Sequence, residues 1–339
     1  MPMNFVPQET EKKVLLILRV LRDADEPLGA RVIARRLRDY GVTLSERTVR
    51  YHLKLMDERG LTRLVGRRDG RVITEKGKDE LRDARVRDKV GFAISRIETL
   101  AFRTTFDPQG RKGLVPINVS FIPKDRFEEA LVAMKPAFES GICVSDLVKV
   151  AREGERLGEV LVPEGMVGFA TVCSIVVNGT LLKAGVPMDS KFGGILQIKD
   201  GRPLRFVELI HYAGSSLDPS EAFIRAKMTA VRGVAERGEG KILANFREVP
   251  ALCRPIVEEV LVKLSKARIG GVLVMGEMSE EVCEVPVELN KMGIILIGGL
   301  NPVACAQEAG VEADNYAMST LLEFRELRDF WEVYEGMVP

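Results

Sequence analysis

The stretch SERTVRYHLKLMDERGL, at positions 45–61, has the pattern of a capped amphipathic helix. It opens on Ser45, a residue type that caps helix N-termini, and a glycine near its end is a common helix stop. Val49, Leu53 and Met56 recur at helical spacing, so they form one apolar stripe. We therefore predict a single helix here that packs through this stripe and leaves its other face in solvent.

The neighbouring segments complete the pattern of a small domain. Residues 10–25 and 26–41 show helical spacing, and residues 61–77 show two short strands around an Asp-Gly turn. Three helices followed by a β-hairpin predict a winged helix-turn-helix, whose third helix enters the major groove of DNA while its hairpin lies along phosphates. The residues predicted to contact DNA are polar or basic and lie off the stripe or on the hairpin: Ser45, Arg47, Thr48, Arg50, Tyr51, Lys54, Arg67, Arg68 and Arg71.

Each of these basic residues, taken alone, is equally well explained as a solvated surface charge. Their order and spacing together with the hairpin favour DNA binding. His52 lies at the edge of the stripe and is interpreted as a packed histidine rather than a ligand.

Composition limits the classes of protein that fit. Residues 1–90 hold 22 Lys and Arg against 15 Asp and Glu, a net charge of +7, whereas the rest of the chain has a net charge of −6. A basic N-terminal module on an acidic body is typical of a nucleic-acid reader attached to something else. No stretch is long and apolar enough for a membrane span, and no signal peptide is visible. The five cysteines lack metal-site spacing, so we expect reduced thiols in a cytoplasmic protein.

The chain of 339 residues divides into three predicted parts. Residues 1–75 form the winged helix, residues 76–112 a helical connector with alternating charges, and residues 113–339 a body in which strands alternate with helices. The predicted fold class is therefore a multidomain α/β (α+β) protein, with an N-terminal winged helix-turn-helix followed by an internally duplicated α/β ligand-sensing domain.

The duplication rests on two stretches that align at a constant offset. GFATVCSIVVNGTLLKAGVPMD (168–189) matches GIILIGGLNPVACAQEAGVEAD (293–314) at 125 residues, and INVSF (117–121) matches ILANF (242–246) at the same offset. The half-repeats span about 113–200 and 238–325, each with a strand, a helix, a strand at 142–150 or 271–276, an arm, an apolar strand, a short helix and a last strand. Between the two half-repeats we predict one more strand and a long helix.

A small-molecule site is expected where the duplicated halves present helix N-termini, because free N–H groups there bind anions. The candidate ligand-binding residues follow the two repeated strands: Cys173, Ser174, Asn178, Lys183, Gly298, Gly299 and Asn301. An alternative is that the glycines only permit close packing of strand and helix.

Enzyme signatures are missing from the sequence. It contains no phosphate-binding glycine loop, and its two histidines, His52 and His211, exclude a multi-histidine metal site within one chain. A hydrolase triad could be drawn from His211, Ser215, Ser216 and Asp218, but Ser-Ser-Leu-Asp-Pro is a better turn and helix N-cap. We predict no catalytic residues, no metal and no cofactor.

The winged helix with SERTVRYHLKLMDERGL, followed by TVCSIVVNGTLLKAGVP, FVELIHYAGSSLDP and GGLNPVACAQEAGV, resembles the NrpR-type nitrogen regulators of archaea. The resemblance covers essentially the whole chain and is most specific in the body motifs. It implies a transcriptional repressor of nitrogen-assimilation and nitrogen-fixation genes that binds double-stranded operator DNA as a homo-oligomer, a dimer or higher. It further implies release from DNA by the effector 2-oxoglutarate. Some members carry two body domains, and this chain has the pattern of the short form, which in some archaea works with a companion NrpR-type chain.

Two alternatives stay open at this point. The first is a winged-helix regulator that senses a different metabolite or acts through a companion protein. The second is an enzyme with an appended DNA-binding domain. Neither alternative requires a membrane partner.

Overall fold

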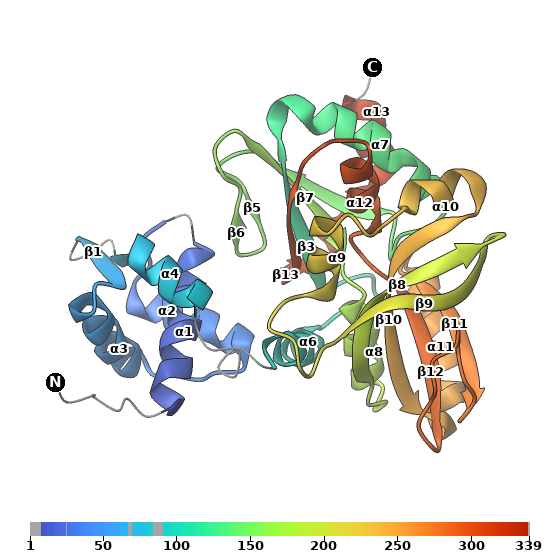
Figure 1. Ribbon diagram of the computed structural model, residues 1–339, viewed down its shortest axis with the longest axis horizontal. Coiled ribbons are helices and arrows are strands. Elements are labelled where there is room, and N and C mark those ends of the chain that lie inside the picture. The colour runs from blue at the N-terminus through green and yellow to red at the C-terminus, as the bar shows by residue number, and fades with distance from the viewer. Residues whose placement is uncertain (1–7, 25, 67–69, 84–90, 338–339) are drawn as a thin grey trace. The chain divides into compact units, whose positions relative to one another are not determined.

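The computed structural model describes residues 8–24, 26–66, 70–83 and 91–337, and the chain divides into two compact units (Figure 1). The first unit comprises residues up to Thr99 together with Gly214–Ser216, and the second comprises Leu100–Ala213 and the residues from Leu217 onward. Within the described ranges, no helix is long and apolar enough to cross a membrane.

The first unit is a winged helix, as the sequence predicts. Its elements are α1 (Gln8–Arg22), α2 (Ala30–Arg36), the 3-10 turn η1 (Leu37–Tyr40), α3 (Glu46–Glu58), β1 (Thr62–Gly66), β2 (Gly70–Ile73) and α4 (Glu75–Asp83). Strands β1 and β2 pair antiparallel, and Leu28 forms a bridge to Arg71 beside them. The chain then continues into α6 (Phe92–Arg103), within which the two units meet in sequence.

Local chemistry explains why α3 begins and packs where it does. Ser45 Oγ accepts a 3.1 Å hydrogen bond from Thr48 N, which satisfies a free N–H group at the helix start. Val49, Leu53 and Met56 are fully buried, so the predicted stripe is confirmed. His52 is also buried, and burial followed by the charge of Lys13 lowers the pKa of its imidazole. A packed histidine was the expected role.

The second unit holds two five-stranded sheets with helices on their faces (Figure 1). The elements of its first copy are β3 (Leu114–Pro123), η2 (Lys124–Arg126), α7 (Phe127–Glu139), β4 (Leu147–Ala151), β5 (Arg156–Leu157), β6 (Val160–Leu161), β7 (Met166–Val172), α8 (Ile175–Lys183) and β8 (Asp189–Lys199). Strand β9 (Arg202–His211) and the helices α9 (Pro219–Arg225) and α10 (Val231–Arg237) follow. The elements of the second copy are β10 (Gly240–Pro250), η3 (Ala251–Cys253), α11 (Arg254–Lys266), β11 (Val272–Met278), β12 (Lys291–Ile297), α12 (Asn301–Glu308), β13 (Asp314–Glu323), η4 (Phe324–Glu326), β14 (Arg328–Asp329) and α13 (Phe330–Met337).

The two sheets share a core of four strands in the same order, and in each sheet the strand at one end of that core comes from the other copy. One sheet runs β13-β3-β7-β4-β14, and the other, taken from the opposite end, runs β9-β8-β10-β12-β11. Strands β3, β7 and β4 correspond to β10, β12 and β11, so β13 of the second copy occupies the place that β8 of the first copy occupies in the partner sheet. The halves are therefore interlocked by reciprocal exchange of strands.

The helices that follow the apolar strands are exchanged as well. Val303 and Ala306 of α12 are buried in one cluster with Met134 of α7, which belongs to the other copy. Val177 of α8 is buried in another cluster with Val260 of α11. Each copy thus completes the core of its partner.

The hydrogen-bond register corrects part of the predicted alignment. Phe121 pairs with Asp314, and Glu248 pairs with Asp189, so β3 and β10 correspond at an offset of 127 rather than 125. Strands β8 and β13 keep the offset of 125. The predicted match of INVSF with ILANF is therefore wrong by two residues. It rests on similar apolar residues, whereas the true register is fixed by the pairing of the backbones.

Two further expectations differ from the structure. The long helix predicted before the second copy is broken into α9 and α10, and Lys227 between them has a φ of 54°, which a continuing helix does not allow. The strand predicted at 142–150 begins only at Leu147. Ser145 in the preceding segment turns the chain, since its Oγ accepts from Leu147 N at 3.1 Å.

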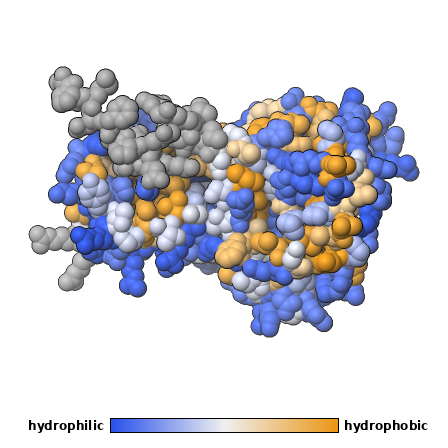
Figure 2. All heavy atoms as spheres, turned by 90° about the horizontal axis from the view of Figure 1, so that it is seen from below, coloured by the Kyte–Doolittle hydropathy of each residue, from blue (hydrophilic) through white to orange (hydrophobic). Residues whose placement is uncertain are grey.

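The surface of the second unit is not uniformly polar. Figure 2 shows hydrophobic side chains reaching the surface in patches among hydrophilic ones. Leu252 and Leu289 are the most exposed of the large apolar side chains in the described residues, at 93% and 81%. Their segments are joined by a 3.0 Å hydrogen bond from Ala251 N to Asn290 O. Exposed apolar groups of this kind are candidates for a protein contact.

The strand exchange predicts that neither copy unfolds alone. In hydrogen exchange at increasing urea, amides of β3 and β10 should open with the same free energy and the same denaturant dependence, because each pairs with a strand of the other copy. Amides of α3 are the control, because α3 lies in the first unit and its opening free energy can differ from that of β3 and β10. Separate opening free energies for β3 and β10 would contradict an interlocked body.

Candidate functional sites

The solvent face of α3 carries most of the residues predicted to contact DNA. Arg47, Arg50, Tyr51 and Lys54 are exposed, and Tyr51 is 61% exposed although it is aromatic. Arg50 forms an i,i+4 ion pair with Glu46, with 69% of the arginine side chain still exposed. An exposed ion pair of this type is weak and can be exchanged for a phosphate or a base. The helix therefore presents cations on the face opposite its buried stripe.

The remaining predicted DNA contacts have other surroundings. Ser45 Oγ is engaged in capping and lies 2.8 Å from Thr48 Oγ1, so both side chains help to shape the helix start. Arg71 donates to Asp57 Oδ2 at 2.7 Å and is 20% exposed, which ties the hairpin to α3. Arg67 and Arg68 lie outside the described residues.

In the second unit, three of the predicted ligand residues gather around a residue that the sequence analysis did not select, Arg247. Cys173, Ser174 and Asn178 are each at most 5% exposed. Ser174 Oγ accepts from Arg247 Nη2 at 3.2 Å. The charge of Arg247 also acts on the Cys173 thiol, although burial dominates and raises the pKa of Cys173 to about 11.

Arg247 is buried and forms no ion pair with a carboxylate of the described residues. It is 1% exposed, and its Nη1 donates to Ser190 Oγ at 3.3 Å. Asn178 Nδ2 donates to the same hydroxyl at 3.1 Å. Within the described part of the chain, the Nε of Arg247 and the Oδ1 of Asn178 have no hydrogen-bond partner. Burial lowers the pKa of the guanidinium, while nearby groups that include the Asp218 carboxyl raise it. A buried cation whose hydrogen bonds, among the described residues, go only to the hydroxyls of Ser174 and Ser190 is a site that favours an anion.

Neutral and weakly acidic groups line the same cluster. Asn245 Nδ2 donates to Ser174 Oγ at 3.3 Å, and Tyr212 donates its hydroxyl hydrogen to Asn245 Oδ1. Asp218 is half-buried. Desolvation raises the pKa of its carboxyl, while hydrogen bonds from Ser220 and Glu221 and the charge of Arg247 lower it. Its Oδ1 caps α9 by accepting from Ser220 N at 2.8 Å, which confirms the N-cap expected in place of a hydrolase triad.

A β-bulge sits at the centre of this arrangement. Arg247 pairs with Ser190 and Phe246 with Phe192, so Lys191 is an extra residue on β8. A bulge re-aims the side chains on either side of it. Arg247 and Ser190 follow the bulge as one pair, and Glu248 and Asp189 form the next pair, so alternation along the strands turns the two pairs toward opposite faces of the sheet.

The other predicted ligand residues do not join the cluster. Lys183 lies at the opposite end of α8, where its Nζ donates to Phe102 O at 3.0 Å. Asn301 clamps β10 through both of its amide atoms, with 2.8 Å and 3.0 Å bonds to the backbone of Leu243. A Cβ on Gly298 would come within 2.6 Å of Leu243 Cβ, and one on Gly299 within 2.4 Å of Asn118 Nδ2. These glycines have the close-packing role that was the alternative interpretation.

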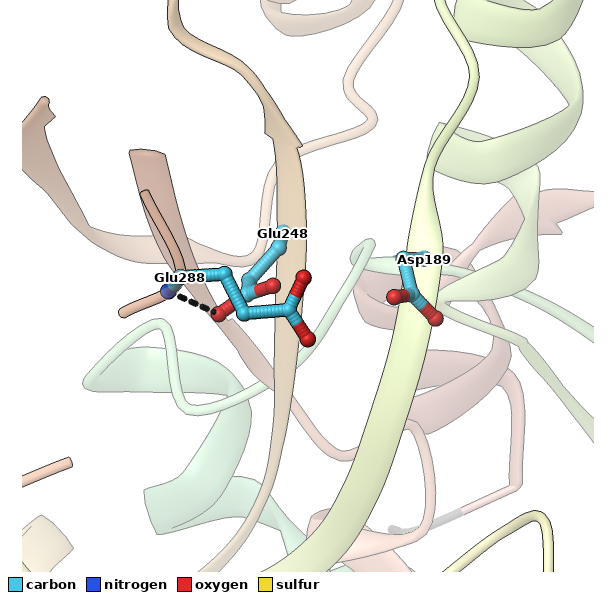
Figure 3. Close-up of side chains that lie close together, drawn as sticks. All are labelled: Asp189, Glu248 and Glu288. Atoms are coloured by element: carbon cyan, nitrogen blue, oxygen red, sulfur yellow. Dashed lines mark hydrogen bonds between the residues drawn. The ribbon is translucent and has the colours of Figure 1, made fainter. Parts of the chain in front are cut away.

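Three carboxylates next to the Arg247 cluster form the one group of metal-ligand type among the described residues: Asp189, Glu248 and Glu288 (Figure 3). Glu248 is 2% exposed, and its Oε1 accepts from Glu288 N at 3.0 Å. Lys191 and Lys291 lie among the three acids, with their Nζ atoms 3.2 Å and 3.4 Å from Glu248 Oε2. The lysines supply the positive charge that a metal ion would otherwise bring, so we assign the group a structural role.

The three carboxylates and the two lysines, Lys191 and Lys291, form an ion cluster whose contribution to stability depends on pH. Hydrogen bonds from Lys191 and Lys291 lower the pKa of Glu288 from its ordinary value of 4.5 to about 2. For Lys191, burial alone would lower the pKa, but hydrogen bonds to Asp189, Glu288 and Glu248 raise it above its ordinary range. A carboxyl with a depressed folded-state pKa stabilises the fold above its unfolded-state pKa. That contribution is lost as pH falls from about 4.5 toward 2.

Comparison with known proteins places the chain in a family. The family model for the NrpR regulatory domains NRD1 and 2 matches residues 90–329, and the model for the ribonuclease R winged-helix domain matches residues 15–81. The chain is 40% identical to the global nitrogen regulator NrpRI of Methanosarcina mazei, over 95% of this chain and 98% of that protein. It is 34% identical to the global nitrogen regulator NrpR of Methanococcus maripaludis, over 90% of this chain and 53% of that protein.

A solved structure agrees with these matches. The chain is similar to a nitrogen repressor-like protein from Methanococcus jannaschii, with a TM-score of 0.60 and 29% identity, over 70% of this chain and 98% of that one. A winged helix joined to such a regulatory body defines a transcription regulator. The chain belongs to the NrpR family of nitrogen regulators. It spans nearly the full length of NrpRI and about half the length of NrpR from M. maripaludis.

The ion cluster generates a test of stability. Glu248→Gln should lower the free energy of unfolding by about 1–3 kcal/mol, because it removes the buried negative charge that faces the half-buried Lys191 and Lys291. Asp314→Asn is the matched control, since Asp314 corresponds to Asp189 in the other copy but lies outside the cluster. Urea denaturation at pH 7 measures both. An equal loss in the two variants would exclude the structural role assigned to Glu248.

Proposed function

We propose that this chain represses nitrogen-assimilation and nitrogen-fixation genes by binding operator DNA through the winged helix, and that 2-oxoglutarate bound at Arg247 releases it. The proposal that 2-oxoglutarate binds at Arg247 rests on one observation: the guanidinium is fully buried and has no ion-pair partner among the carboxylates of the described residues. The proposal that the winged helix binds operator DNA is supported by the exposed basic face of α3. The proposal involves no catalytic step.

The chemistry of 2-oxoglutarate suits the Arg247 cluster. A guanidinium binds a carboxylate through two parallel hydrogen bonds, and such charged bonds are about twice as strong as neutral ones. The hydroxyls and amides of Ser174, Ser190 and Asn178 can serve a keto group or the second carboxylate. In the structure these groups close around Arg247, each less than a tenth exposed. An anion can reach the guanidinium only when they separate.

That requirement links binding to a change of shape. Arg247 belongs to β10, Ser174 lies between β7 and α8, and Ser190 belongs to β8, so separating them displaces segments of both copies. An effector shifts an equilibrium only by its difference in affinity between two states. An open body would bind 2-oxoglutarate and the closed body would not, which provides that difference.

We also propose that the chain acts as a homo-oligomer, with or without a companion NrpR-type chain. Two winged helices on one operator must match half-sites about one helical turn apart, so a change in the body can move them out of register. The exposed apolar side chains Leu252 and Leu289 support a protein contact on the body.

The DNA half predicts the effect of removing two exposed arginines. Arg47→Ala with Arg50→Ala should weaken operator binding by at least about 30-fold, because each base contact contributes about 1–3 kcal/mol. The control is Arg202→Ala with Arg225→Ala, which removes the same charge from exposed positions on the body. Gel-shift titration of both variants measures the difference. Retention of operator affinity by the first variant would rule out α3 as the DNA-reading helix.

The effector half predicts the effect of neutralising Arg247. Arg247→Met should weaken 2-oxoglutarate binding by about 10- to 150-fold, because hydrogen bonds to a charged group contribute about 1.5–3 kcal/mol. Operator binding should persist but should no longer be released by the effector. Lys183→Met is the control, because Lys183 was a candidate from sequence and lies at the other end of α8. Calorimetry and gel shift on folded variants test this, and weakened binding in the Lys183 variant alone would contradict it.

A further inference from the structure

The exchange of strands creates two junctions that correspond to each other. The Arg247 junction, where β8 meets β10, consists of Ser174, Asn178, Ser190, Asn245 and Arg247. Through the registers of the two sheets, the corresponding positions where β13 meets β3 are Gly299, Val303, Asn315, Asn118 and Ser120, which we call the Ser120 junction. A duplicated body could bind an anion at both junctions or at one.

The hydrogen bonds of the Ser120 junction are complete. Ser120 Oγ donates to Asn315 Oδ1 at 2.6 Å, and Asn315 Nδ2 donates to Gln307 Oε1 at 2.6 Å. Asn118 Nδ2 donates to Thr171 Oγ1 at 3.2 Å, while its Oδ1 accepts from Met318 N at 3.1 Å. All of these partners are neutral.

The contrast with the Arg247 junction lies in charge and in unpaired atoms. The Arg247 junction has a buried cation and two buried polar atoms without a partner in the described residues, Arg247 Nε and Asn178 Oδ1. The corresponding positions at the Ser120 junction are a serine and a valine, and Ser120, Asn118 and Asn315 leave no buried side-chain atom unpaired. An anion placed there would lose its water and find no positive charge.

The Ser120 junction is also filled. Gly299 takes the place of Ser174, and a Cβ on Gly299 would lie only 2.4 Å from Asn118 Nδ2. Val303 is fully buried in the core between α7 and α12. The amide of Asn118 thus occupies the space next to the glycine, and opening the junction would break bonds that nothing replaces.

We infer that each chain binds one effector anion, at the Arg247 junction alone, and that the Ser120 junction stays closed in both states. This inference rests on the proposed function, because it takes 2-oxoglutarate as the anion. It makes the regulatory movement one-sided: β8 and α8 shift against β10, while β13 and α12 keep their place against β3.

Calorimetric titration of the full chain with 2-oxoglutarate tests the stoichiometry. The expected result is one site per chain, weakened about 10- to 150-fold in Arg247→Met and unchanged, to within about twofold in affinity, in Ser120→Ala. Because Arg247→Met removes a buried side chain, Ser190→Ala is a milder second variant of the same junction, and it should weaken binding several-fold. Hydrogen exchange gives an independent readout, with ligand-dependent changes in β8, α8 and β10 and none in β13 and β3.

The possible failures are distinguishable. Two sites per chain, or one site that Ser120→Ala weakens and Arg247→Met spares, would overturn the single-junction inference while leaving an effector-controlled repressor in place. No heat with 2-oxoglutarate, together with no release of operator, would overturn the proposed effector and this inference with it.

Discussion

The body depends on one constraint, the pairing of β8 with β10 and of β13 with β3. Strand β8 of the first copy pairs with β10, the first strand of the second copy, and β13 of the second copy pairs with β3, the first strand of the first copy. Each sheet is therefore completed by a strand from the other copy of the same chain. The cores follow the same rule, since α8 is buried with α11 and α12 with α7. A displacement of one copy therefore changes the pairing of β8 with β10 or of β13 with β3. A ligand bound at one of these pairings can thus affect both copies, as a sensor requires.

The β8–β10 ladder concentrates the charged chemistry of the body. Arg247 and Glu248 are consecutive residues of β10 and pair with Ser190 and Asp189 beside a bulge at Lys191. The glutamate faces two lysines, whereas the arginine, among the described residues, donates hydrogen bonds only to the hydroxyls of Ser174 and Ser190. The charge of Glu248 is thus balanced within the fold, whereas the charge of Arg247 is available to bind an anionic ligand. The corresponding residues of β3, Ser120 and Phe121, carry no charge, which is why we assign the two ladders different roles.

The sequence was most informative where local chemistry decides the structure. The cap at Ser45, the buried stripe from Val49 to Met56 and the stop at Gly60 could all be predicted, because helix ends and faces depend on nearby residues. The order of strands and helices in each copy could be predicted for the same reason. The exchange of strands and the offset of 127 could not, since both depend on pairing between residues far apart in the chain. Asn118 matching Asn245 and Pro123 matching Pro250 were the available signals for the correct offset.

The candidate effector site shows the same division. Cys173, Ser174 and Asn178 were found because they follow an apolar strand, and they do lie together. Arg247 was missed because it lies in the middle of a strand, where a single charge resembles a solvent-facing residue. Phe246 precedes it and Glu248 follows it, in a strand buried almost along its whole length. Lys183 was selected for its charge, but the length of α8 places it away from Ser174.

The most direct test of the account is a crystal structure of the chain with 2-oxoglutarate bound. We expect a carboxylate of the ligand to bind the guanidinium of Arg247, with Ser174 and Ser190 moved apart and the bonds between Ser120 and Asn315 intact. A ligand bound elsewhere, with the Arg247 junction still closed, would contradict the account.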